Sequence, residues 1–186
     1  INCMNHDAAM AVVEIKDGIG KILWAAHAER YSKIKNDHYL NHAIVDEAMT
    51  YGPFKKVVYY EKPLLTFERL LETYLGAAPR GGRSFIAAMQ VWTKEKLFLK
   101  AQIKNNLKEI QADLEEDLAN LPNLLFSEHH LSHAAAAFYP SPFNESAILC
   151  MDGVGEWATT SAWIGKGNKI LPLWEISFPH SLGLLY

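Results

Sequence analysis

The strongest constraint on the fold is a repeat, because the strand and turn signals that open the chain return near its end. Cys3 and Met4 precede a polar turn, and Cys150 and Met151 do the same 147 residues later. Lys-Ile-Leu follows a glycine turn at residues 21–23 and again at 169–171, an offset of 148. We therefore predict an internal duplication with a complete first unit over residues 1–140. A second unit, over 146–186, would hold only its opening strands.

The elements between the two copies alternate between strand and helix. Apolar runs at residues 1–4, 8–15 and 22–26, separated by turns, predict a three-stranded meander. Helical spacing then covers 42–51, 64–75, 84–99, 103–121 and 127–139, with strands at 57–60 and 124–126. This β-β-β-α-β-α-β-α order predicts an α/β fold. Used twice, it resembles the ribonuclease H-like halves of the actin-like ATPase superfamily, whose facing hairpin turns hold nucleotide phosphates.

Composition excludes several classes of function. The chain has 186 residues, 49% of them hydrophobic, and a net charge of −3. We expect no nucleic-acid partner, because domains that bind a phosphate backbone carry a basic excess. No apolar run approaches the roughly 20 residues that span a bilayer, and no signal peptide opens the chain, so we expect no membrane association and a cytoplasmic protein. Both ends look cut, which predicts a piece of a longer protein.

Three histidines within five residues form the densest chemical motif. The run from Ser127 to Pro140 predicts a helix, on which His129 and His133 lie four residues apart on one face. Asp152 ends the next predicted strand, and open α/β folds place ligands at the carboxyl ends of their strands. Two imidazoles and a carboxylate suit Fe(II), and also Zn or Mn. His130 points about 100° away from His129, so we expect it to pack or to support the site.

Other readings of these histidines are weaker. A zinc protease of the H-E-x-x-H type needs a glutamate after the first histidine, and His130 stands there instead. Isolated buried histidines often only pack in a core, which leaves a non-catalytic, nucleotide-binding actin-like domain as one alternative. In the turn after the strand, Gly153 and Gly155 would let the backbone approach a phosphate, beside Glu156.

At these residues the sequence resembles a known family, the O-carbamoyltransferases of the NodU/CmcH type, in their N-terminal domain. The matching motifs are Glu-His-His-Leu-Ser-His-Ala at residues 128–134, Tyr-Pro-Ser-Pro-Phe at 139–143, Asp-Gly-Val-Gly-Glu at 152–156, Asn-His-Asp-Ala at 5–8, Glu-Arg-Tyr-Ser at 29–32, Ala-Pro-Arg-Gly at 78–81, Arg-Ser-Phe at 83–85 and Ser-Leu-Gly-Leu-Leu-Tyr at 181–186. The resemblance covers nearly the whole chain.

The resemblance implies a carbamoyltransferase that uses ATP and carbamoyl phosphate. In the family, a separate YrdC-like domain makes carbamoyl-adenylate. The domain resembled here moves the carbamoyl group to the hydroxyl of a small acceptor, with iron in its site. This chain lacks the YrdC-like domain and most of a second actin-like half, so we expect the fragment alone to be inactive. A relative that transfers threonylcarbamoyl to tRNA is an alternative, but its H-x-E-G-H motif fits Leu131 and Ser132 poorly.

Roles carry over to individual residues. His129, His133 and Asp152 correspond to metal ligands of the family. The metal would act as a Lewis acid on the oxygen atoms of carbamoyl-adenylate. Gly153, Gly155 and Glu156 would lie against phosphate. His6 and Asp7 sit on the facing turn, where we expect one of them to orient or deprotonate the acceptor hydroxyl. In the repeat, Asp152 falls opposite Asn5. Arg80 and Arg83 form either an anion-guiding loop or a solvated one.

Overall fold

A computed structural model describes residues 1–4, 7–92, 98–113 and 123–186 of the chain. The chain divides into two compact units. The first combines residues 1–59 with 93–125, and the second combines 60–92 with 126–186. The predicted division at residues 140–146 stays a prediction. None of the described helices has the length and apolar character needed to cross a membrane.

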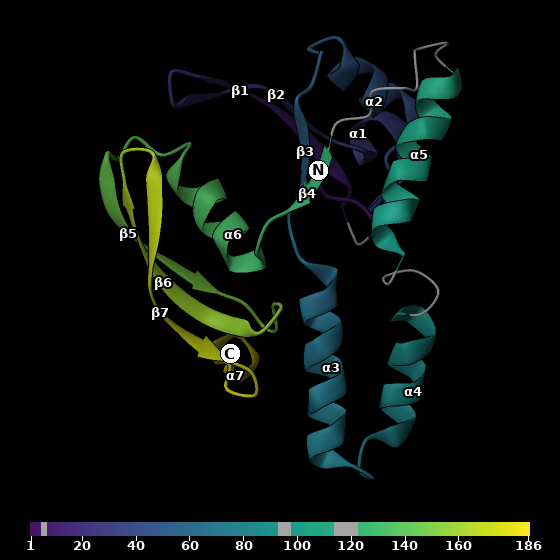
Figure 1. Ribbon diagram of the computed structural model, residues 1–186, viewed down its shortest axis with the longest axis vertical. Helices are drawn as coiled ribbons and strands as arrows, with labels where there is room; N and C mark the ends of the chain where they lie inside the picture. The colour runs from purple at the N-terminus through teal and green to yellow at the C-terminus, as the bar shows by residue number, and fades with distance from the viewer. Residues whose placement is uncertain (5–6, 93–97, 114–122) are drawn as a thin grey trace. The chain divides into compact units, whose positions relative to one another are not determined.

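The first unit is built on a β-hairpin and the helices that follow it (Figure 1). Its elements are β1 (Ala9–Lys16), β2 (Ile19–His27), α1 (Glu29–Ser32), α2 (His42–Met49), β3 (Lys56–Tyr59), α5 (Leu99–Asp113) and β4 (Asn123–Phe126), with β3 paired to β4. Asp17 and Gly18 both have positive φ, as a tight two-residue hairpin turn requires. The predicted face of α2 is confirmed, because Ile44, Val45 and Ala48 are buried.

The predicted first strand of the meander is wrong as a separate strand. Residues 1–4 form only an isolated bridge between Asn2 and Ala9. Met4 adopts a left-handed conformation with a φ of 62°, which breaks an extended run. The terminal amine of Ile1 instead donates a hydrogen bond to the carbonyl of Val58 in β3. The segment therefore bonds to β1 on one side and to β3 on the other.

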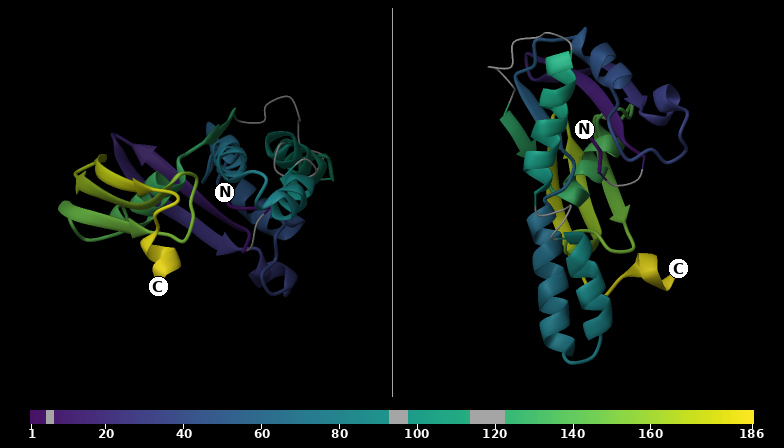
Figure 2. Two further views of the ribbon diagram at one scale, coloured as in Figure 1. Left: turned by 90° about the horizontal axis from the view of Figure 1, so that it is seen from below. Right: turned by 90° about the vertical axis from the view of Figure 1, so that its right-hand side faces the viewer.

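The second unit packs one helix on a three-stranded antiparallel sheet (Figures 1 and 2). Its elements are α3 (Pro63–Ala77), α4 (Gly82–Val91), α6 (His129–Phe138), β5 (Glu145–Met151), β6 (Ala158–Lys166), β7 (Lys169–Ser177) and α7 (Leu182–Leu185), with strand order β5-β6-β7. Ala134 and Phe138 of α6 are buried against Ile148, Cys150 and Trp163 of the sheet. The strands predicted over residues 146–178 are confirmed as a meander.

Two predicted helices extend beyond the described residues. The structure describes α5 as far as Asp113 of the predicted 103–121, and α4 ends at Val91 although helical spacing continued to residue 99. Residues 93–97 and 114–122 lie outside the described part of the chain. The α3–α4 pair is joined by contacts along its length, from Phe67 with Trp92 to the stacked rings of Tyr74 and Phe85.

The two hairpins share one register, which supports the predicted duplication. In β1–β2 the pairing shifts between Val12 and Val13, with Val12 opposite Trp24. In β6–β7 it shifts between Ala162 and Trp163, with Ala162 opposite Trp174, so both positions recur at an offset of 150. A β-bulge is a specific local device, and a matching pair is stronger evidence than short sequence matches.

The loops that precede these hairpins match at the same offset. The amide of Asn2 donates to the carbonyl of Ala9, and the amide of Asp152 donates to that of Thr159, at 2.9 and 2.8 Å. The constant offset of 150 replaces the predicted 147 and 148. Asp152 consequently falls opposite Asn2 rather than Asn5.

Gly165 of β6 gives a direct test of how α6 meets its sheet. A Cβ at this position would lie 2.5 Å from the ring of Phe138, which is buried. We expect Gly165→Ala to lower the free energy of unfolding of this unit by roughly 1–3 kcal/mol, because the ring must shift within a packed core. Urea denaturation followed by far-ultraviolet circular dichroism measures the change.

Gly76→Ala is the matched control, because Gly76 lies in helix α3 with nothing within 4 Å of the added methyl group. Helix propensity predicts a gain of up to about 1 kcal/mol for this variant. Equal stability of the two variants would contradict the packing of α6 described above.

Candidate metal centre

Helix α6 places two histidines one turn apart at its beginning. The helix starts at His129, with Glu128 as the N-cap residue in an extended conformation, and Tyr139 caps its end just before Pro140. The backbone amide of Ser132 donates to the carbonyl of Glu128 in the first turn. The predicted start at Ser127 is therefore two residues too early, and the predicted end is confirmed. His129 and His133 share a face, with their ring centroids 4.6 Å apart.

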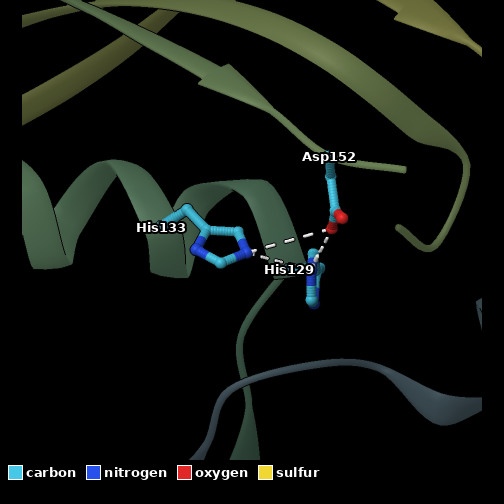
Figure 3. A group of neighbouring side chains, drawn as sticks. All are labelled: His129, His133 and Asp152. Carbon is cyan, nitrogen blue, oxygen red and sulfur yellow. Dashed lines mark hydrogen bonds and ion pairs between the residues drawn. The ribbon is translucent and has the colours of Figure 1, made fainter. Parts of the chain in front are cut away.

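Asp152 directs one carboxylate oxygen toward these rings from the end of β5 (Figure 3). Its Oδ1 accepts a hydrogen bond from the amide of Gly153 at 2.7 Å, which leaves Oδ2 free to face the helix. Oδ2 lies 2.7 Å from Nε2 of His129 and 4.0 Å from Nε2 of His133. The two Nε2 atoms are 3.0 Å apart. The three residues predicted as ligands are thus brought together.

The donor atoms of this cluster fit a single cation. Among the described residues they form the one group of histidine, cysteine and acidic side chains whose ligand atoms converge, all within 4.8 Å. Metal–nitrogen bonds of about 2.1 Å at right angles place neighbouring ligand atoms about 3.0 Å apart, close to the two shorter spacings here. The single proton on Nε2 of His129 cannot serve both Asp152 and His133, so a shared cation satisfies the three atoms better than hydrogen bonds do.

Charge at the cluster also favours a cation. The carboxylates of Glu61 and Glu156 join that of Asp152 in acting on His129. Burial lowers the pKa of His129, but the bond and charge of Asp152 and the charges of the two glutamates raise it above its ordinary value overall. The hydrogen bond from His129 is the main reason that the pKa of Asp152 falls to about 2. Burial and the charge of His129 lower the pKa of His133, which keeps its lone pair available.

The segment that follows β3 along the chain surrounds His129, and sequence reasoning missed it. The ring of Tyr60 lies 5.7 Å from that of His129, and Oε2 of Glu61 lies 3.7 Å from its Nδ1. The carbonyl of Tyr60 accepts a hydrogen bond from Oγ of Ser132 at 2.7 Å. The available signal was an acidic residue, Glu61, two positions after the end of a strand, where ligand sites form in open α/β folds.

Glu156 holds backbone rather than an anion. Its side chain is buried, and its Oε1 accepts a hydrogen bond from the amide of Lys62. The backbone amide of His129 also donates to this carboxylate, so Glu156 satisfies an open N–H at the start of α6. The contact of Glu156, Gly153 and Gly155 with phosphate stays a prediction.

Gly155 lets the turn approach the histidine helix closely. An added Cβ would lie 2.7 Å from the carbonyl of Ala158 and 3.3 Å from Cδ2 of His129. Gly153 is less crowded, since its nearest neighbour would be Leu184 at 3.7 Å. Close approach is therefore the established use of Gly155, and its contact with phosphate stays a prediction.

His130 packs beside the cluster, as expected from its direction on the helix. It is 4% exposed, and its Nδ1 lies 2.6 Å from Oγ of Ser161. The indole N–H of Trp163 donates to the same oxygen at 2.7 Å. Burial and the charge of His129 lower the pKa of His130. This polar chain anchors α6 to β6.

The roles predicted for the remaining site residues stay predictions. His6 lies outside the described residues. Asp7 belongs to the first unit, where its carbonyl accepts a hydrogen bond from the side-chain amide of Asn2. Arg80 and Arg83 are exposed at the turn between α3 and α4. Helix α3 has 15 residues and starts next to Lys62, so this turn lies about 22 Å along the helix from Lys62.

The segment of the short helix α7 contacts the backbone of Asp152 and Gly153. Oγ of Ser181 donates to the carbonyl of Gly153 at 2.7 Å and accepts from the amide of Leu184 at 3.0 Å. A Cβ on Gly183 would lie only 2.4 Å from the carbonyl oxygen of Asp152. The backbone around Asp152 is therefore held from both the sheet and α7.

Comparison with known proteins identifies the family. The family model described as "Carbamoyltransferase N-terminus" matches residues 1–186. The chain belongs to this family. An uncharacterized protein of Synechocystis, sll1178, is 54% identical over 191 residues, which cover all of this chain and 30% of that protein. The nodulation protein NolNO of Sinorhizobium fredii is 28% identical over 193 residues, covering all of the chain and 25% of the relative.

A second nodulation protein matches one segment. NolO of Bradyrhizobium diazoefficiens is 40% identical over 60 residues, which are 31% of this chain and 11% of that protein. The carbamoyltransferase N-terminal chain described here spans only 25–30% of the length of the first two relatives. The activity of a whole protein is therefore a matter for proposal.

The metal assignment predicts a binding experiment. Titration of the chain with Zn²⁺, or anaerobically with Fe²⁺, should show one site, and both His129→Ala and His133→Ala should weaken it by at least tenfold, because each removes a ligand. His27→Ala is the control, since His27 is exposed on β2 in the other unit. Equal affinity of the control and the two ligand variants would remove the assignment.

Proposed function

We propose that the protein carrying this chain transfers a carbamoyl group to a hydroxyl of a small acceptor molecule. Family membership supports carbamoyl transfer in general. The observation that carries the site is the convergence of His129, His133 and Asp152 on one point. We further propose that the donor is carbamoyl-adenylate, made from ATP and carbamoyl phosphate by a YrdC-like domain elsewhere in the longer protein.

The three converging residues would hold Fe²⁺, or Zn²⁺ or Mn²⁺ in its place. The bound ion would supply a Lewis acid that polarises oxygen atoms of the donor. His129 and His133 contribute neutral imidazoles from one rigid helix, and Asp152 contributes the charge. The carboxylate of Glu156 holds the start of α6 in place by accepting a hydrogen bond from the backbone amide of His129.

Space for a ligand is available next to the cluster. A cavity of about 240 Å³ lies against His129 and His130 and is also lined by Trp157, Trp163 and Glu175. In our proposal the turn at Gly153 and Gly155 lies against the phosphate of the donor. We also propose that His6 or Asp7 orients or deprotonates the acceptor hydroxyl.

We also propose an actin-like fold with ribonuclease H-like halves. Residues 1–140 would form one complete half, and residues 146–186 would form the opening strands of a second. The hydrogen bonds that residues 1–2 make to Val58 and Ala9 support this, because they put an opening segment between β1 and β3. The bulges repeated at an offset of 150 support a second copy of the same opening. A purely structural role for the histidines is less favourable, because packing alone leaves the short Nε2–Nε2 contact unexplained.

Activity of the longer protein tests this function. With ATP, [¹⁴C]carbamoyl phosphate and a panel of hydroxylated acceptors, label should move to an acceptor. His129→Ala and Asp152→Asn should each reduce transfer by roughly a hundredfold or more, because electrostatic stabilisation of the transition state is lost. His27→Ala should leave transfer unchanged.

The 186 residues alone should show no transfer. Transfer by the isolated chain would contradict the need for further domains. Full activity of the Asp152→Asn protein would contradict the metal-assisted mechanism.

A further inference from the structure

We propose that Glu61 is a positioning residue that accepts the Nδ1 proton of His129 and thereby turns the Nε2 lone pair toward the cation. This inference rests on the proposed metal centre and adds a residue that the motif does not contain. Glu61 lies 68 positions before His129 in the sequence and follows Tyr59, the last residue of β3.

The first observation is a buried ring nitrogen that lacks a partner. Nδ1 of His129 is inaccessible to solvent and makes no hydrogen bond among the described residues. A buried polar atom without a partner is costly, so it usually marks a missing interaction. Oε2 of Glu61 lies 3.7 Å from this nitrogen, and the side chains of His129 and Glu61 are 16% and 15% exposed.

The second observation is that the backbone around Glu61 is fixed against α6 on both sides. The carbonyl of Tyr60 accepts from Ser132, and the amide of Lys62 donates to Glu156. The ammonium group of Lys62 also pairs with Glu128 at 2.8 Å. With its neighbours held, Glu61 needs only a side-chain adjustment of about 1 Å to reach hydrogen-bond distance of Nδ1.

The consequence concerns which nitrogen of His129 carries the proton. If Nε2 carries it, Asp152 at 2.7 Å accepts it, and Nε2 has no lone pair for a metal. If Nδ1 carries it, Glu61 accepts it, and the lone pair of Nε2 faces Oδ2 of Asp152 and Nε2 of His133. Glu61 and Asp152 thus compete for one proton, and a bound cation settles the competition in favour of Glu61. Metal-ligating histidines commonly donate their second N–H to a carboxylate in this way.

The competing explanation is that Glu61 only stabilises the fold through its charge. Glu156 is an unsuitable acceptor for Nδ1, because its carboxylate already accepts the backbone amides of Lys62 and His129. Among the described residues, Glu61 is therefore the carboxylate placed to orient the ring. A structural role predicts that the metal-free variant loses stability, whereas a positioning role predicts that it loses metal affinity. Measuring both quantities on the same variants therefore separates the two roles.

The test is titration of the longer protein with Zn²⁺ by isothermal calorimetry, together with thermal unfolding of each metal-free variant. Glu61→Ala should weaken Zn²⁺ binding by 10- to 100-fold. Glu61→Gln should weaken it by a smaller factor, because an amide oxygen still accepts the N–H. Glu145→Ala is the matched control, since Glu145 is an exposed glutamate of the same unit that pairs with Lys166; its affinity should match the unsubstituted protein.

A double-substitution cycle completes the experiment. In a His129→Ala background, Glu61→Ala should cause no further loss of affinity, because the ring that it orients is absent. Equal Zn²⁺ affinity of Glu61→Ala and the unsubstituted protein would overturn the role of Glu61 and leave the metal centre standing. The role of Glu61 would also be overturned if its loss of affinity accompanied unfolding of the metal-free variant and persisted in the His129→Ala background. Absence of Zn²⁺ binding by the unsubstituted protein would overturn the metal centre itself and this inference with it.

Discussion

The convergence of three electron-rich atoms from two elements is the constraint on which the second unit depends. Nε2 of His129 lies within hydrogen-bond distance of both Oδ2 of Asp152 and Nε2 of His133, so the lone pairs of these atoms would repel one another without a proton or a cation between them. The surrounding structure holds them there regardless. Gly155 allows the turn to touch the rings, and Glu156 secures the start of the helix. The unit therefore spends stability on keeping a charged cluster assembled, which is typical of a functional site.

The ligand set was predictable from sequence because its geometry is local. Four residues on a helix give two histidines on one face, and an aspartate directly after a buried strand falls at the strand end. Glu61 was not predictable in the same way, because only the folded chain brings it to His129. The structural use of Glu156 was also not predictable: a glycine-rich turn suggests an anion site, whereas the fold shows its carboxylate accepting the backbone amides of Lys62 and His129.

The fold was predictable to the level of its strands and helices, and less so in its register. Short identical tripeptides suggested offsets of 147 and 148, whereas the hydrogen bonds establish 150. Bulges cause this error, because an extra residue in one strand leaves no mark in an apolar pattern. The opening segment is not a separate strand because Met4 has a left-handed backbone conformation, which its residue type does not predict.

The corrected register gives the two units unequal chemistry. Asp152 stands opposite Asn2, so at the matching loop position one unit has a carboxylate and the other has a neutral amide. Asn2 uses its side chain to bond the carbonyl of Asp7 within its own loop. The two openings thus share backbone hydrogen bonds, while only the second has a carboxylate at this position.

The close contact between Gly183 and the carbonyl of Asp152 has a mechanical meaning. With no room for even one methyl group between them, α7 cannot tilt toward β5 without pushing the peptide group that carries the carboxylate. A displacement of this four-residue helix toward β5 would therefore also move the backbone that carries the Asp152 carboxylate, and with it the distance from that carboxylate to His129.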